Sequence, residues 1–60
     1  MNIFEAFNMM NLGHIVKDSY GNWFKKEGNT LVDSENQGKT WYPTDEFQFG
    51  YINQEWELVE

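Results

Sequence analysis

Hydrophobic and polar residues follow two different periods along this chain, and the first 12 residues show the helical one. Apolar side chains recur there at i, i+4 and i+7, with two neighbours that widen the stripe: Ile3, Phe7 and Met10, then Phe4 and Ala6. Asn2 can cap a helix, and Glu5 follows at the spacing of a capping box. Gly13 stands after Leu12, where a left-handed C-terminal cap is expected. We therefore predict a helix over residues 3–12.

The period changes to that of extended strands after Gly13. Residues 14–17 contain two adjacent β-branched side chains and predict a first strand, followed by a turn over 19–22. Residues 23–26 and 30–33 flank a short connection that contains Gly28, which favours a hairpin. Residues 34–38 are polar and predict an exposed loop, and 40–42 predict a short strand ended by Pro43.

The last part of the chain carries the clearest strand pattern. Thr44, Asp45 and Glu46 resemble a cap and an acidic first turn, so residues 44–50 are expected to form one helical turn closed by Gly50. In residues 55–58 apolar side chains alternate with carboxylates, which places Trp56 and Leu58 on one face and the glutamates in water.

These elements predict one small α+β domain spanning residues 1–60. Its expected architecture is an N-terminal helix packed on a four- to five-stranded, mostly antiparallel sheet. Fewer strands would leave Trp23, Trp41 and Trp56 without a common core. A chain of 60 residues with no cysteine has no disulfide to support its core, so large side chains, or a second copy of the chain, must supply stability.

Charge excludes one class of partner. Ten carboxylates against four lysines and no arginine give a net charge of −6, which is a poor supply of cations for phosphate, so we expect no direct binding of nucleic acid. An acidic surface suits solubility, a basic protein partner, or imitation of nucleic acid. No membrane-length apolar run and no signal-peptide pattern occur, and cysteine is absent, so we expect a soluble cytoplasmic protein that does not bind membranes.

The residues that carry catalysis in other proteins are scarce here. There is no cysteine, neither serine lies in a nucleophile elbow, and the single histidine, His14, is expected to cap the preceding helix. The acidic pairs 45–46 and 55/57 are interpreted as a helix first turn and a solvated strand face, although such pairs could bind a hard cation. Residues 33–38 lack the alternating ligands of a calcium loop. We predict no enzymatic activity, no cofactor and no metal site.

The aromatic content is the feature that points to binding. Eleven of the 60 residues are Phe, Tyr or Trp, which is a large share for so small a core. Exposed aromatic side chains dominate binding hot spots. We expect a subset to form an exposed anchor with acidic side chains as its electrostatic complement: Tyr20, Trp41, Tyr42, Phe49 and Tyr51, with Asp33, Glu35, Asp45 and Glu46.

The two ends of the chain share a pattern with a group of short phage and prophage proteins. Residues 3–7 and 12–16 match its opening helix, glycine and strand, and residues 55–59 match its closing strand of an acidic residue, Trp, Glu and two hydrophobic residues. In this respect the chain resembles the Thoeris anti-defence family, whose members sequester a nucleotide-derived immune signal. Where that family has an arginine and then a tryptophan, this chain has Lys17 and Tyr20.

Three functional hypotheses follow. The leading one is a non-enzymatic, phage- or prophage-encoded accessory protein in a bacterial cytoplasm, which inhibits a host defence or nucleic-acid-processing protein by binding its basic surface. The resemblance implies an alternative, a sponge for a nucleotide-like molecule, with a site completed by oligomerisation and formed by Lys17, Tyr20, Trp23 and Trp41. The third is a structural or virion-associated protein.

Overall fold

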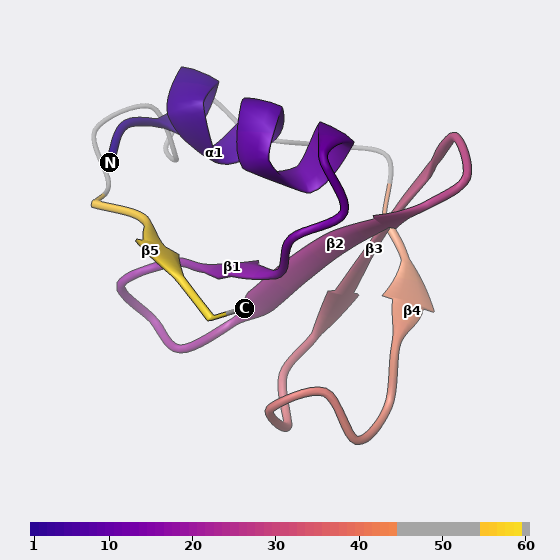
Figure 1. Ribbon diagram of the computed structural model, residues 1–60. Helices are drawn as coiled ribbons and strands as arrows, with labels where there is room; N and C mark the ends of the chain where they lie inside the picture. The colour runs from indigo at the N-terminus through magenta and orange to yellow at the C-terminus, as the bar shows by residue number, and fades with distance from the viewer. Residues whose placement is uncertain (45–54, 60) are drawn as a thin grey trace.

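One helix covers one face of a five-stranded antiparallel sheet in the computed structural model, which describes residues 1–44 and 55–59 (Figure 1). The strand order is β4-β3-β2-β1-β5, so the first and last strands of the chain pair with each other at one edge of the sheet. The α+β class and the antiparallel sheet predicted from the sequence are confirmed. The elements are α1 (Ile3–Asn11), β1 (Val16–Lys17), β2 (Trp23–Glu27), β3 (Thr30–Ser34), β4 (Tyr42–Pro43) and β5 (Glu57–Leu58).

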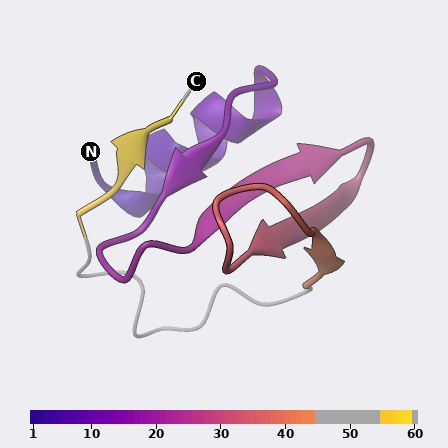
Figure 2. The ribbon, with the colours of Figure 1, turned by 90° about the horizontal axis from the view of Figure 1, so that it is seen from below.

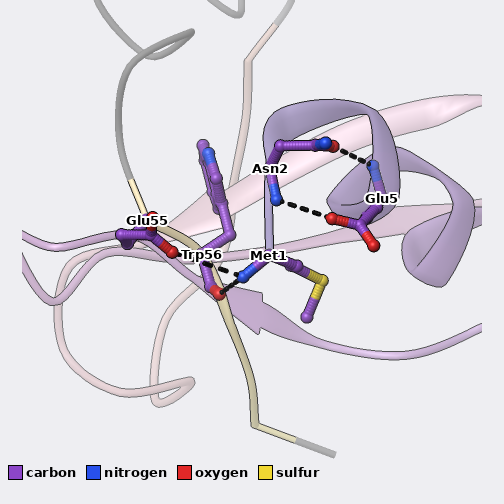
Figure 3. Close-up of polar contacts among 5 residues, drawn as sticks. All are labelled: Met1, Asn2, Glu5, Glu55 and Trp56. Carbon is purple, nitrogen blue, oxygen red and sulfur yellow. Dashed lines mark hydrogen bonds and ion pairs between the residues drawn. The ribbon is translucent and has the colours of Figure 1, made fainter.

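Both ends of α1 are fixed by local chemistry. The Asn2 side chain accepts a hydrogen bond from the Glu5 N–H at 2.9 Å, and the Glu5 carboxylate accepts one from the Asn2 N–H at 3.0 Å (Figure 3). This is the predicted capping box. At the other end, Gly13 has φ +96° and its N–H donates to the Met10 carbonyl, while the His14 N–H donates to the Met9 carbonyl. These two bonds form a Schellman motif, which explains why the helix ends at Asn11.

The predicted hairpin is present, with a connection of two residues. Glu27 of β2 pairs with Thr30 of β3, so Gly28 and Asn29 form the turn. Gly28 has φ +63° and occupies the first central position, which is the place of glycine in a type II′ turn. This turn matches the right-handed twist of the two strands and fixes their register.

The core lies between α1 and the sheet. Its fully or nearly buried side chains are Ile3, Ala6, Met10, Val16, Phe24 and Trp56. The rings of Phe24 and Trp56 meet edge to face, with their centroids 5.3 Å apart. Phe4 was expected to widen the inward stripe of the helix, but it is 73% exposed. Ala6, the other residue expected to widen the stripe, is buried, because Ile3, Ala6 and Met10 share one helical face.

The last strand closes the sheet beside the start of the chain. The Met1 ammonium donates to the Trp56 carbonyl at 2.8 Å (Figure 3). The Trp56 N–H in turn donates to the Met1 carbonyl at 2.9 Å. Trp56 is buried and the glutamates on either side are exposed, as the alternation predicts. Leu58 was expected to share the burial of Trp56, but it is 47% exposed. It pairs with Val16 on β5, which is an edge strand of the sheet.

The expected common core of three tryptophans is wrong. Trp23 pairs with Ser34 and Lys17, whereas Phe24 pairs with Val16, so Trp23 lies on the face opposite α1. Trp41 packs with it there, and the Lys25 ammonium lies 4.3 Å from the centroid of the Trp41 ring. In Figure 2, the loop between β3 and β4 crosses this second face of the sheet. The alternation of side chains across a strand therefore divides the tryptophans between two layers.

Gly38 lies against the Trp23 ring on the second face of the sheet. It has φ +86°, and a Cβ atom at this position would lie 3.2 Å and 3.3 Å from two ring carbons of Trp23. We expect Gly38→Ala to lower the free energy of unfolding by about 1–3 kcal/mol, measured by urea denaturation. Gly21→Ala is the matched control, because Gly21 has φ +88° with nothing within 4 Å of the added Cβ. Equal losses in the two variants would contradict a role for the Trp23 ring.

Candidate functional site

Two of the connecting segments lie at the same end of the sheet. Trp23 at the start of β2 pairs with Ser34 at the end of β3, so the turn before β2 and the loop after β3 lie at the same end (Figure 1). The Gly28 turn lies at the opposite end. The turn over residues 18–22 and the loop over 35–41 contain several of the predicted binding residues, and the topology brings them to one side of the molecule.

The loop over 35–41 is held by side chains rather than by secondary structure. Ser34 is fully buried, and its hydroxyl accepts a hydrogen bond from the Gly38 N–H at 2.8 Å and donates to the Asn36 side-chain oxygen at 2.8 Å. That oxygen also accepts from the Thr40 N–H at 2.9 Å, and the Asn36 amide donates to the Thr40 hydroxyl at 3.1 Å. The prediction of an exposed loop from residue 34 is therefore wrong at Ser34, which ends β3 and anchors the loop.

A hollow of about 610 Å³ opens beside this loop. We call it the acidic hollow, and it is lined by Asp33, Glu35, Asn36, Thr40 and Tyr42. Asp33 and Tyr42 are direct partners across β3 and β4, and directly opposed side chains stand on the same face of a sheet. Tyr42 is 64% exposed, Glu35 is exposed, and Asp33 is half-buried. The hollow therefore presents two carboxylates next to a largely accessible phenol ring.

The acidic hollow has side chains suited to binding a positively charged group. The lining residues that the structure describes include two carboxylates and no lysine or histidine. A lysine ammonium or an arginine guanidinium can bind carboxylate oxygens with charge-assisted hydrogen bonds, and either can lie over an aromatic face. Across residues 1–44 and 55–59, no group of three or more His, Cys, Asp or Glu side chains is arranged to hold a metal ion.

The other predicted partner-binding residues are distributed more widely. Tyr20 is 77% exposed in the turn that shares an end of the sheet with the hollow. Trp41 is half-buried in the second layer, beneath Lys25, so less of its ring is accessible than was expected. Asp45, Glu46, Phe49 and Tyr51, and the predicted helical turn around them, lie outside the described residues. The structure thus brings together Asp33, Glu35 and Tyr42.

Only some of the residues predicted to bind a nucleotide-like molecule lie close together in the structure. Lys17 and Trp23 are direct partners on β1 and β2, on the face opposite the helix. Lys17 also forms an ion pair with Glu57 at 3.5 Å. The hollow of about 370 Å³ beside it is lined by Lys17, Asp18, Ser19, Gly21, Glu55 and Glu57. One ammonium against three carboxylates gives a local charge that opposes a phosphate group.

Two polar residues that shape the site were missed by the sequence analysis. Asp18 is 5% exposed, and its carboxylate accepts hydrogen bonds from the N–H groups of Tyr20 and Asn22, both at 2.9 Å. Asn36 organises the loop that lines the acidic hollow. The available signal is the type and position of these residues, because Asp and Asn before a turn often bond to backbone N–H groups a few residues ahead.

Comparison of the chain with protein-family models, with curated proteins and with solved structures returned no match. Among the residues that the structure describes, no helix is long and apolar enough to cross a membrane.

Proposed function

We propose that this protein is a non-enzymatic binding protein that recognises a basic surface on a protein partner through the acidic hollow. The observation that carries the proposal is the grouping of Asp33, Glu35 and Tyr42 around one concavity, with no cation among the described lining residues. An aromatic side chain next to carboxylates provides both contact area and charge complementarity. The resemblance to phage anti-defence proteins suggests the setting, in which the protein inhibits a host defence or nucleic-acid-processing protein in a bacterial cytoplasm.

Charge supports a partner of this kind in two ways. The net charge of −6 steers a positively charged surface toward the molecule and speeds encounter. At contact, the two carboxylates of the hollow compete for the same cations that a nucleic-acid phosphate would bind, so a cleft that normally holds nucleic acid is a suitable target. Both effects weaken as salt screens the charges.

One observation favours the sponge hypothesis as a second candidate. Lys17 and Trp23 stand opposite each other on neighbouring strands, which would allow a base to stack beside an ammonium group. The carboxylates around Lys17 oppose a phosphate at that position, so we place this function second. A thermal shift with cyclic or ADP-ribose nucleotides, abolished by Lys17→Gln, would favour it over protein binding.

The proposed function predicts a partner whose affinity depends on the hollow. Immobilised protein is used to capture partners from a bacterial lysate, and the purified partner is then titrated by calorimetry. We expect Asp33→Asn with Glu35→Gln, and separately Tyr42→Ala, to weaken binding about tenfold or more. The affinity of the unmodified protein should fall as sodium chloride rises from about 50 to about 300 mM.

Matched controls separate this effect from general loss of charge or apolar surface. Glu27→Gln removes an exposed carboxylate at the far end of the sheet, where it pairs with Lys25 at 3.4 Å, and Leu58→Ala removes an exposed apolar side chain. Both should bind within about twofold of the unmodified protein. A partner whose binding ignores the hollow variants, or weakens as much with Glu27→Gln, would contradict the proposal.

A further inference from the structure

The outward face of α1 carries two large apolar side chains in water. Phe4 is 73% exposed and Leu12 is 71% exposed, although the chain is small and needs apolar burial for stability. Ile3, Ala6 and Met10 face the sheet, so the helical period directs residues 4, 8 and 12 away from it. Phe4, Asn8 and Leu12 follow one another at intervals of four residues, which makes them one ridge of the helix surface. We call these three residues the helix ridge.

The charge of this face differs from that of the rest of the described surface. From Ile3 to Leu12 the only charged side chain is Glu5, and its carboxylate accepts a hydrogen bond from the Asn2 N–H in the capping box. Carboxylates are exposed elsewhere, at Glu27, Glu35, Glu55 and Glu57. Two molecules that each carry −6 repel one another, so they can approach most readily through a face that carries few charged side chains. The helix ridge is such a face.

The order of residues along the ridge is self-complementary. Asn8 is exposed at its centre, with Phe4 four residues before it and Leu12 four residues after it, about 12 Å apart. In an antiparallel pair of helices related by a twofold axis, Asn8 meets its own copy while Phe4 packs against Leu12 of the other molecule. An asparagine amide both donates and accepts hydrogen bonds, so two of them can pair across the axis.

We propose that the helix ridge is the contact surface for a second copy of this chain. Packing of ridges four residues apart is the commonest arrangement of helices in globular proteins. A helix of nine residues offers a small contact area, so the dimer is weak and forms with concentration, with a dissociation constant on the order of 100 μM. This inference does not depend on the proposed function, because the helix ridge and the acidic hollow share no residue.

Sedimentation equilibrium between about 10 μM and 1 mM tests the proposal. We expect the weight-average mass to rise from that of one chain, 7.2 kDa, toward twice that value. Added salt should strengthen the dimer because it screens like charges, whereas it weakens binding at the acidic hollow. A mass that stays at one chain up to about 1 mM, or a dimer that added salt weakens, would overturn the proposal.

Three variants locate the contact. Phe4→Gln, Leu12→Gln and Asn8→Asp should each raise the dissociation constant about tenfold, the last by placing two carboxylates beside the axis. Leu58→Gln, on an exposed apolar residue away from the helix, should leave the constant unchanged. Circular dichroism confirms that each variant is folded. A dimer that survives the three ridge variants, or that Leu58→Gln removes equally, would show that another surface is used.

Amide chemical shifts provide an independent measurement on the unmodified protein. Dilution should move the signals of residues 4, 8 and 12 and their helical neighbours, and leave those of Asp33, Glu35 and Tyr42 in place. Movement confined to the acidic hollow would assign self-association to that site and overturn the role of the helix.

Discussion

Trp56→Ala is expected to abolish the cooperative unfolding transition of this protein at 25 °C. Trp56 is 1% exposed, packs edge to face on Phe24, and joins α1 to β5 across the core. Truncating a buried tryptophan to alanine costs about 3–5 kcal/mol through lost transfer energy and the cavity left behind. A 60-residue domain has a total stability of about 3–9 kcal/mol, so the loss is comparable to the whole. Far-UV circular dichroism during urea titration measures the effect.

Two further variants make the Trp56 result specific. Trp56→Phe keeps a ring in the core and should retain a transition, at reduced stability. Leu58→Ala, two residues along the same chain segment, should cost less than about 1 kcal/mol, because Leu58 is 47% exposed. A similar loss for Leu58→Ala and Trp56→Ala would show that β5, and not the buried ring, determines stability.

Asp18→Ala is expected to lower the free energy of unfolding by about 2 kcal/mol or more. The Asp18 carboxylate is 5% exposed and accepts hydrogen bonds from the N–H groups of Tyr20 and Asn22, and its own N–H donates to the Asn22 carbonyl. Removing the carboxylate leaves two backbone donors without their acceptor, and hydrogen bonds to a charged group are stronger than neutral ones. The turn that joins β1 to β2 should loosen as a result.

The control for Asp18 is the isosteric amide. Asp18→Asn keeps an oxygen where Oδ1 accepts both N–H groups, so it should cost about 1 kcal/mol or less. Urea denaturation gives the free energies, and hydrogen exchange at the Tyr20 and Asn22 amides reports the turn directly. Unchanged exchange at these amides in Asp18→Ala would contradict the role assigned to the carboxylate.

The two surfaces proposed here have opposite physical characters. The acidic hollow attracts cations through Asp33 and Glu35, whereas the helix ridge carries two exposed apolar side chains and no charged side chain. Salt should therefore weaken one association and strengthen the other. Because no residue is common to both surfaces, a dimer formed through α1 would present two acidic hollows, one on each chain.

The sequence alone determined those helices, turns and strands that are set by interactions between residues close together in the chain. The capping box of Asn2 and Glu5 and the glycine at position 13 define the helix, because their partners lie within a few residues. The hairpin at Gly28 follows from the conformational freedom of one residue between two β-prone runs. The burial of Trp56 between exposed glutamates follows from the period of two in a strand. The candidate residues Asp33, Glu35 and Tyr42 were predicted from the sequence as members of an acidic and aromatic set, but the sequence did not indicate that they line one hollow.

Only the tertiary structure decided which residues share a face or a hollow. Strand register places Trp23 on the face opposite α1, and Trp41 packs beside it there. Phe4 is exposed because the helical period turns Ile3, Ala6 and Met10 toward the sheet. Asp33 meets Tyr42 through the pairing of β3 with β4, and the position of Pro43 on that edge strand follows from the same register. Register depends on contacts between residues distant in the sequence, and the pattern of any one segment contains no information about its neighbour across the sheet.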